Sequence, residues 1–255
     1  QRLWKLEKSS ETDNIEKAFE QKQLFIADGH HRYETALNFK KKLIEDGVIK
    51  DENHPGNYVM MMLIDMENPG LVVFPTHRLV RGLKSFDLAA TLEKLRDYFD
   101  VCRIEKSEID AALEKNAAKK AYVLCAGSDR FYLLVLKDTE KAREALDALN
   151  PGKSDAYKNL DVTVLHSLIL EKLFGIDKEN MARQINLAYT RDKDEAIRLA
   201  GSADCNCAFL IHPTAVSEIK DVALAGEKMP QKSTYFYPKL ITGLVMNELV
   251  PVEDI

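Results

Sequence analysis

The apolar residues of this chain form short runs that alternate with stretches of helical periodicity. Runs at 58–64, 122–126 and 207–211 have the length of strands, whereas 30–46 and 161–174 carry apolar residues at helical spacing. This alternation predicts a mixed α/β architecture. No run approaches the roughly 18 apolar residues that a membrane-spanning helix needs, so we expect no membrane segment.

The charge balance limits the partners of the chain. Its 36 Lys and Arg residues are outnumbered by 41 Asp and Glu residues, which gives a net charge of −5 and a pI near 5.8. A domain that binds nucleic acid through phosphates usually carries a basic surplus, so a nucleic-acid partner is disfavoured. No signal-peptide pattern opens the chain, and we expect a cytoplasmic protein, with a homo-oligomer left open. Because Gln1 is not an initiator methionine, we expect a fragment or a processed chain.

The four cysteines predict thiols rather than a metal site. Cys102 and Cys125 sit singly in apolar runs, which predicts that both lie in the core. Cys205 and Cys207 are two residues apart, with no second pair and no suitably spaced histidines. That spacing disfavours a structural zinc site, and we expect reduced thiols.

Local signals predict many of the elements. The apolar runs 24–27 and 58–64 are predicted strands, and 71–74 is expected to pair with the second across a turn at 68–70. Other predicted elements are helices capped by Thr12 or Asp13, Asp87 and Ser107, a hairpin of 122–126 with 131–136, a helix from 161 to 174, strands at 185–189 and 207–211, and helices opened by an Asp192–Glu195 capping box and by Pro213 and Thr214.

The segment after the predicted strand 24–27 carries the chemistry that we consider first. Gly29 permits a sharp turn into a helix and lets a ligand approach the backbone closely. The unpaired N–H groups of that helix terminus favour an anion, and Arg32 can donate a forked pair of hydrogen bonds to phosphate oxygens. His30 and His31 diverge on a helix, so one is expected to face the ligand. The segment predicts a phosphate-binding site.

Asp28 needs its own explanation, because a carboxylate repels an anion. Its presence is consistent with holding a magnesium ion or accepting a proton from an attacking hydroxyl. The alternative is structural: Asp28 caps the helix and Arg32 forms a surface ion pair.

Two further segments are candidate ligand contacts. In Gln231-Lys232-Ser233-Thr234, the lysine supplies a point charge for phosphate, and the hydroxyls and amides supply hydrogen bonds. The alternative is a packed loop anchored by the aromatic residues that follow. His77 and Arg78 come after an apolar strand, where Arg78 could bind phosphate and His77 act as an acid or base. A loop histidine beside a surface arginine is the alternative. His166, on an apolar helix, is left out as a core histidine.

Residues 26–33, Ile-Ala-Asp-Gly-His-His-Arg-Tyr, resemble the glycine-x-histidine-arginine signature of the ParB/sulfiredoxin superfamily. The rest of the chain resembles the bacterial and archaeal domain-of-unknown-function family numbered 1015, through 74–79, 160–166 and the long run 225–239. Members of that family begin well before the residue that is Gln1 here, so the resemblance implies that an N-terminal segment is absent.

The resemblance implies that Gly29, His31 and Arg32 contact nucleotide phosphates. The superfamily includes sulfiredoxins that use ATP, CTP-binding partition proteins, and an archaeal kinase of free serine, which 28–32 resembles best. Sulfiredoxin-like chemistry needs a cysteine that this motif lacks. The kinase implies an acidic residue upstream of the motif, either in the absent segment or among Glu11, Asp13 and Glu16.

Together these features predict a kinase that transfers phosphate from ATP or ADP, with Mg, to a small hydroxyl substrate, free serine first. In this scheme Asp28, His30 and His31 are catalytic and Asp28 holds the metal. The predicted nucleotide contacts are Gly29, Arg32, His77, Arg78, Gln231, Lys232, Ser233 and Thr234. The alternatives are a nucleotide-binding regulator with a DNA or protein partner, and a nucleotide hydrolase.

The same resemblance predicts a division of the chain into three parts. Residues 1–84 would be the ParB/sulfiredoxin-like phosphate-binding part, 85–150 an α/β insertion or support region, and 151–255 a C-terminal α/β part. The loop 228–239 of this last part is expected to return to the site.

Overall fold

The computed structural model describes residues 3–239, 243 and 245–246. By their internal contacts, the residues separate into two units: unit 1, residues 1–59 with 247–255, and unit 2, residues 60–246. No helix among the described residues is long and apolar enough to cross a membrane.

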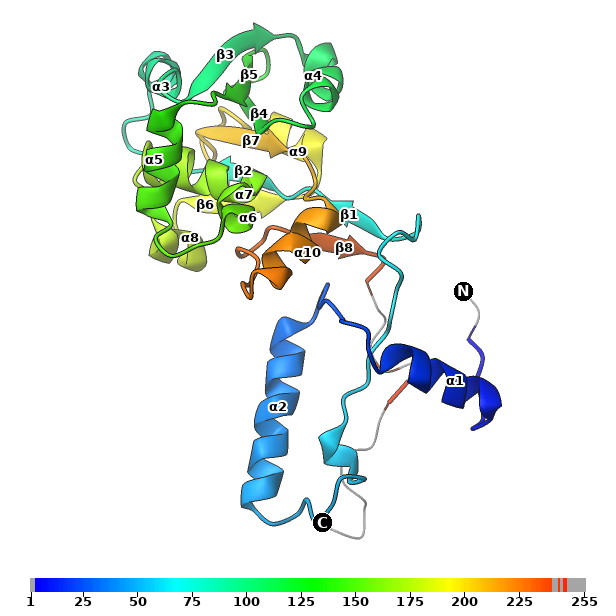
Figure 1. The fold of residues 1–255 in the computed structure, drawn as a ribbon. Helices are drawn as coiled ribbons and strands as arrows, with labels where there is room; N and C mark the ends of the chain where they lie inside the picture. Colours follow the sequence, from blue (N-terminus) through cyan, green and yellow to red (C-terminus); the bar gives the residue numbers. More distant parts are fainter. Residues whose placement is uncertain (1–2, 240–242, 244, 247–255) are drawn as a thin grey trace. The chain divides into compact units, whose positions relative to one another are not determined.

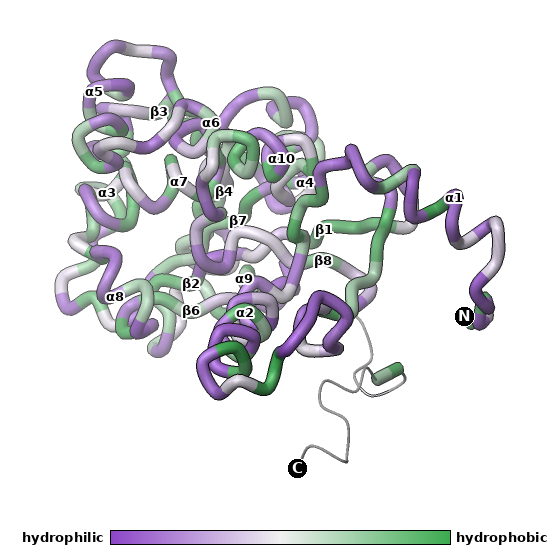
Figure 2. Tube along the Cα trace, turned by 60° about the horizontal axis from the view of Figure 1, so that its bottom comes forward, coloured by the Kyte–Doolittle hydropathy of each residue, from purple (hydrophilic) through white to green (hydrophobic). Residues whose placement is uncertain are grey.

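The described residues of unit 1, 3–59, form helices joined by segments without regular structure (Figure 1). Helix α1 spans Ser10–Phe19, α2 spans His30–Glu45, and a short 3-10 helix η1 spans Pro55–Asn57. The predicted cap of α1 is displaced to Ser9, whose backbone N–H donates to Thr12 Oγ1 at 2.9 Å. Helix α2 begins where the sequence predicts. It is largely hydrophilic (Figure 2), and Leu43 is its one buried residue.

The two strands predicted in and next to this unit do not form. Residues 24–27 and 58–64 have no strand pairing, and Leu24, Ile26 and every side chain from 58 to 64 are exposed. A strand needs a neighbouring strand to satisfy its backbone groups, and neither of these two segments pairs with one. Apolar content alone therefore gave a wrong prediction at both places.

Unit 2 is built on a six-stranded sheet in which every neighbouring pair is antiparallel. The order is β3-β5-β4-β7-β2-β6. The strands are β2 (His77–Val80), β3 (Phe99–Ile104), β4 (Ala121–Cys125), β5 (Phe131–Leu136), β6 (Leu187–Thr190) and β7 (Cys207–Ile211). The predicted hairpin is confirmed as β4 and β5, and the predicted strand at 207–211 as β7.

The centre of this sheet is buried on both faces. All residues of β4 and β7 are buried, as continuous apolar strands covered on both sides should be. Along β4, Tyr122 and Leu124 join one core cluster and Val123 and Cys125 the other, because successive side chains point to opposite faces. Helices α3, α5 and α7 contribute to the first cluster, and α4 and α9 to the second.

Two predicted caps of unit 2, Asp87 and Asp192, are confirmed, whereas the cap predicted at Ser107 is wrong, because Ser107 lies within a 3-10 helix and Glu108 is the N-cap of the α-helix that follows. Helix α3 starts after Asp87, whose side chain accepts from Ala90 N at 2.7 Å, and α9 starts after Asp192, which accepts from Glu195 N at 3.0 Å. The helices are η2 (Lys106–Glu108), α3 (Leu88–Leu95), α4 (Ile109–Lys115), α5 (Glu140–Leu149), α6 (Asp155–Lys158), α7 (Asp161–Val164), α8 (Lys178–Arg183), α9 (Lys193–Leu199) and α10 (Val216–Leu224). The predicted long helix from 161 is continued after α7 by a π-helix, η3 (Leu165–Glu171).

A second, two-stranded sheet in unit 2 joins segments far apart in sequence. Strand β1 (Val72–Phe74) pairs antiparallel with β8 (Tyr235–Tyr237). The predicted partner of 71–74, the run 58–64, is therefore wrong. Phe74 contacts the Tyr237 ring, with centroids 5.4 Å apart. The aromatic tail residues thus form an edge strand that anchors the segment before it.

The mixed α/β architecture is confirmed, and so is a buried Cys125, whereas Cys102 is exposed on β3 and not in the core. Edge position explains the difference, because β3 is the outer strand of the sheet. All four cysteines are free thiols. The division at 84 and 150 stays a prediction. The six-stranded sheet takes strands from all three predicted parts.

Candidate functional site

The turn into α2 has the geometry of an open helix N-terminus. Gly29 is the N-cap residue with φ of 86°, in the left-handed region that glycine adopts without strain. No side chain caps the helix. A Cβ at Gly29 would lie 2.9 Å from Nη2 of Arg32, so the absent side chain leaves room for that guanidinium. The turn combines uncapped amides with a nearby cation, which suits an anion.

Charged side chains surround this turn. Arg32 Nη2 lies 3.3 Å from Asp28 Oδ2, and both side chains are at least half exposed. The imidazole of His31 is fully exposed, with Nδ1 3.6 Å from Glu34 Oε2, whereas His30 is half-buried. The predicted divergence of the two histidines is therefore present. The Asp28–Arg32 pair is the surface ion pair that the structural alternative predicts. It also holds the guanidinium over the turn.

The metal role of Asp28 depends on groups that a ligand would bring. Among the described residues, no cluster of three or more His, Cys, Asp or Glu side chains could hold a metal ion. Mg²⁺ is commonly bound by one or two carboxylates together with substrate phosphates and water. The single carboxylate of Asp28 is enough for this mode of Mg²⁺ binding, in which substrate phosphates and water supply the other ligands.

Arg78 is the most unusual residue of unit 2, because it is a completely buried cation on β2, an interior strand next to the edge strand β6. Its guanidinium donates to the Thr76 carbonyl, to the Lys232 carbonyl at 3.1 Å and to His166 Nε2 at 3.3 Å. Its Nε has no hydrogen-bond partner among the described residues. Burial lowers the pKa of Arg78 to about 10, so it remains charged at neutral pH.

His77 precedes it on the same strand and is also buried. Its Nδ1 accepts a hydrogen bond from the Ile211 backbone N–H at 3.3 Å. Burial lowers the pKa of His77 to about 4, and the positive charge of Arg78 adds to the effect. The side chain is thus a neutral acceptor inside the sheet. Both His77 and Arg78 are buried among the described residues. Their predicted contacts with phosphate stay predictions.

The segment 231–234 is fastened to this buried arginine. Lys232 has a φ of 56°, a conformation costly for a residue with a Cβ, and its carbonyl is the one that Arg78 holds. The Ser233 hydroxyl donates to the Pro230 carbonyl at 2.7 Å, and the Thr214 hydroxyl donates to the Ser233 carbonyl at 3.1 Å. Gln231 and the Lys232 side chain are exposed, and Thr234 is half-buried. Of this set, Gln231 and Lys232 are available to a ligand.

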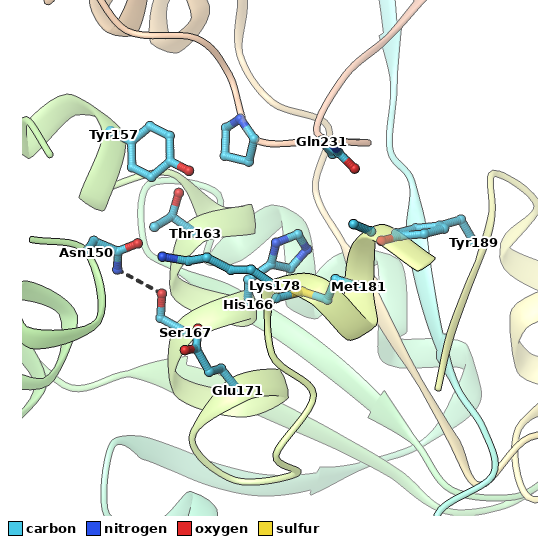
Figure 3. Close-up of a pocket in the computed structure, with 12 residues that line it drawn as sticks. Asn150, Tyr157, Thr163, His166, Ser167, Glu171, Lys178, Met181, Tyr189 and Gln231 are labelled. Carbon is cyan, nitrogen blue, oxygen red and sulfur yellow. Dashed lines mark hydrogen bonds between the residues drawn. The ribbon is translucent and has the colours of Figure 1, made fainter. Parts of the chain in front are cut away.

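A pocket of about 220 Å³ lies beside this segment (Figure 3). It is formed by the π-helix η3, helices α5 to α8, strand β6 and the loop before β8. The lining residues are Asn150, Tyr157, Thr163, His166, Ser167, Glu171, Lys178, Met181, Ala182, Tyr189, Pro230 and Gln231. Gln231 is the one residue predicted from sequence that lines it.

The sequence predicts His166 as a core histidine without a ligand role, yet the residue lines the pocket and contacts Arg78. Burial lowers the pKa of His166 well below its ordinary value, and the Arg78 charge adds to this. The imidazole is therefore neutral and faces the pocket. The one signal in the sequence is a histidine within a long apolar helix. In the structure, His166 lies where this helix widens into the π-helix η3. A single sequence does not reveal such a widening.

The structure thus brings together Arg78 and Lys232, adjacent to His77, within unit 2. Asp28, Gly29, His30, His31 and Arg32 form a separate set within unit 1.

Comparison with solved structures finds similar chains at low identity. One is a conserved hypothetical protein from Pyrococcus furiosus, with 18% identity, a TM-score of 0.39, and coverage of 83% of this chain and 68% of that one. Others are free serine kinase in complex with AMP, at 17% identity and a TM-score of 0.40, and a variant of that kinase in complex with ADP, at 17% and 0.38, each covering 83% of this chain and 66% of that one. This chain therefore spans about two thirds of their length. No curated protein matches.

Comparison with family models gives an extended match. The family described as a protein of unknown function, DUF1015, matches residues 1–163, which is more than half of the sequence. The predicted family is confirmed, and the matched range contains the motif 74–79, whereas the run 225–239 lies outside it. The chain belongs to the DUF1015 family.

Proposed function

We propose that this protein is a nucleotide-dependent phosphotransferase that acts on a small hydroxyl-bearing substrate. The observation that carries the proposal is the turn at Gly29, where a left-handed glycine, an uncapped helix N-terminus and the Arg32 guanidinium occur together. Backbone amides and a guanidinium are the donors that phosphate oxygens accept from most readily.

The residues of the turn have complementary roles in this proposal. The amides of the first turn of α2 and Arg32 bind the nucleotide phosphates. Asp28 holds magnesium, which would neutralise phosphate charge, or orients the acceptor hydroxyl. His31, which is fully exposed, and His30 assist proton transfer. Phosphoryl transfer needs mainly positioning and charge stabilisation, and the turn supplies both.

The residues of unit 2 have roles proposed separately. Gln231 and Lys232 are exposed and can contact a phosphate or a substrate. Arg78 holds the Lys232 carbonyl at 3.1 Å, so we assign it to positioning that segment, with its direct phosphate contact kept as a prediction alongside those of His77, Ser233 and Thr234. The motif resemblance makes free serine the first acceptor to test.

The proposal is tested by thermal-shift titration with ATP, ADP and CTP, each with and without magnesium. A nucleotide at 100 times its Kd should stabilise the protein by about 2.7 kcal/mol. Arg32→Ala should abolish the shift. Arg183→Ala is the matched control, because Arg183 is as exposed as Arg32 and also forms an (i, i+4) pair, 2.9 Å from Glu179.

A turnover assay then separates the candidate functions. The nucleotide that stabilises the protein is incubated with and without L-serine, and phosphoserine and free phosphate are measured. Phosphoserine that depends on Asp28 supports the phosphotransferase. Phosphate release without an acceptor indicates a hydrolase, and stabilisation without any turnover indicates a nucleotide-binding regulator. Unchanged turnover in Asp28→Asn would contradict the role assigned to that carboxylate.

A further inference from the structure

The pocket of unit 2 has a chemical character of its own. Tyr189, Met181 and Pro230 give its lining apolar surface. Figure 3 shows the polar side chains of Asn150, Thr163 and Ser167 on the side of the pocket away from Tyr189. Its volume of about 220 Å³ is below the range of about 300–1,000 Å³ that is usual for pockets of drug-sized ligands. A small metabolite fits this space, and a whole nucleotide does not.

The π-helix accounts for the polar side. His166 and Glu171 are five residues apart, and in an α-helix of 3.6 residues per turn they would lie on different faces. The i→i+5 hydrogen bonding of a π-helix closes each turn over more residues, as in the bond from Lys172 N to Ser167 O at 3.0 Å. The wider turn places both side chains along one pocket. Such helices are rare and frequently occur at functional sites.

The hydrogen bond from Arg78 determines which nitrogen of His166 carries the proton. A guanidinium only donates, so His166 Nε2, 3.3 Å from Arg78 Nη2, must accept. A neutral imidazole that accepts at Nε2 carries its proton on Nδ1. The pocket is therefore lined by a neutral histidine donor with a buried positive charge behind it.

Two further donors face the pocket: a hydroxyl without a hydrogen-bond partner among the described residues, and an ammonium that bonds a carbonyl but no described carboxylate. The Thr163 side chain is 3% exposed, and its hydroxyl has no hydrogen-bond partner among the described residues. Lys178 extends across the pocket (Figure 3), where its ammonium donates to the Leu149 carbonyl at 3.2 Å and pairs with no described carboxylate. A buried hydroxyl without a partner is costly, and a ligand that accepts from it would remove that cost.

From these groups we propose that the pocket binds a small monocarboxylate that also bears a hydrogen-bond donor, such as a hydroxy acid. The carboxylate accepts from Lys178, Thr163 and the His166 Nδ1–H group. The donor of the ligand faces Glu171, the one carboxylate that lines the pocket. A single accessible ammonium matches one negative charge, and Glu171 repels a phosphate dianion about twice as strongly as a monocarboxylate.

The test is isothermal titration of the 255-residue protein with D-glycerate, propionate and inorganic phosphate, in the absence of nucleotide. Propionate has the carboxylate without the donor. We expect saturable binding of glycerate at millimolar or lower concentration, weaker binding of propionate, and none of phosphate. Glu171→Gln should narrow the preference for glycerate over propionate.

Three variants test the residues that carry the proposal. Lys178→Gln and Thr163→Val should each weaken glycerate binding at least tenfold, while Lys220→Gln, an exposed lysine on α10 outside the pocket, should bind as the wild type does. Thr163→Val should also raise Tm, because it removes the unpaired hydroxyl. This rise shows that the variant is folded.

The proposal is overturned if no carboxylate binds the wild type saturably, if phosphate binds more tightly than glycerate, or if Lys178→Gln and Lys220→Gln lower affinity equally. Arg32→Ala should bind glycerate normally, since the pocket lies within unit 2. A loss of nucleotide binding and a loss of glycerate binding are therefore separate results.

Discussion

Units 1 and 2 of this protein differ sharply in how much apolar surface they bury. In unit 2, whole strands such as β4 and β7 are buried between two layers of helices. In residues 3–59 of unit 1, Leu43 and Gly56 are the buried positions, although Trp4, Phe39 and other large apolar residues occur there. Hydrophobic burial is the main source of stability, so unit 2 carries most of it. The turn at Gly29 is instead held by local contacts.

The difference in buried apolar surface between the two units is tested most directly by truncating one phenylalanine in each unit. Phe209 on β7 is fully buried, and its ring lies 6.2 Å from that of Phe174, so Phe209→Ala should lower the free energy of unfolding by about 3–5 kcal/mol. Phe39 on α2 is 36% exposed, and Phe39→Ala should cost about 1 kcal/mol or less. Urea denaturation followed by circular dichroism measures both.

Equal losses in the two variants would mean that unit 1 contributes a core of its own. A loss at Phe209 alone would confirm that the cooperative unfolding transition reports on unit 2. The variants share the same change of side chain, so differences in transfer energy between residue types do not enter.

The same contrast explains where sequence-based prediction worked. Asp87 and Asp192 were predicted as helix caps and both accept from the amide three residues on, because a cap depends on neighbouring residues alone. The runs 58–64 and 207–211 have similar apolar content, yet only the second is a strand, since it has neighbours on both sides. Long-range pairing decided the outcome, and a single sequence does not contain it.

The candidate site was predictable to a similar extent. The turn at Gly29 follows from a local pattern, and the structure gives the left-handed glycine and the Asp28–Arg32 pair. Arg78 and His166 are 88 positions apart in sequence, and only the sheet and the π-helix bring them together. Arg78 was predicted as a phosphate contact. Its complete burial could not be foreseen, because a charged residue at the start of a strand usually faces water.

The dependence of stability on acid pH is a second test of the difference between the units, because the buried His77 lies in unit 2. His77 has a pKa of about 4 when folded and about 6.5 when unfolded. Below pH 6.5 the unfolded chain binds a proton that the folded protein does not, so stability is complete above pH 6.5. It falls as the pH drops towards 4, by up to about 3 kcal/mol.

His77→Asn should reduce this dependence between pH 6.5 and 4, because the asparagine oxygen can accept from the Ile211 N–H without binding a proton. Urea denaturation of the wild type and the variant at several pH values measures the difference. Parallel pH profiles for the two proteins would show that His77 takes no part in the acid sensitivity.

The smallest expected effect on stability concerns the residue with the largest proposed effect on binding. Arg32→Ala removes an exposed pair within unit 1, and Arg183→Ala removes a matched pair within unit 2. Exposed ion pairs contribute little, so both variants should unfold within about 0.5 kcal/mol of the wild type in urea without nucleotide. A clear loss of stability in Arg32→Ala would mean that the Asp28–Arg32 pair is part of the fold of unit 1. Stability unchanged in both, with nucleotide stabilisation lost only in Arg32→Ala, would show that the turn is kept for its ligand rather than for folding.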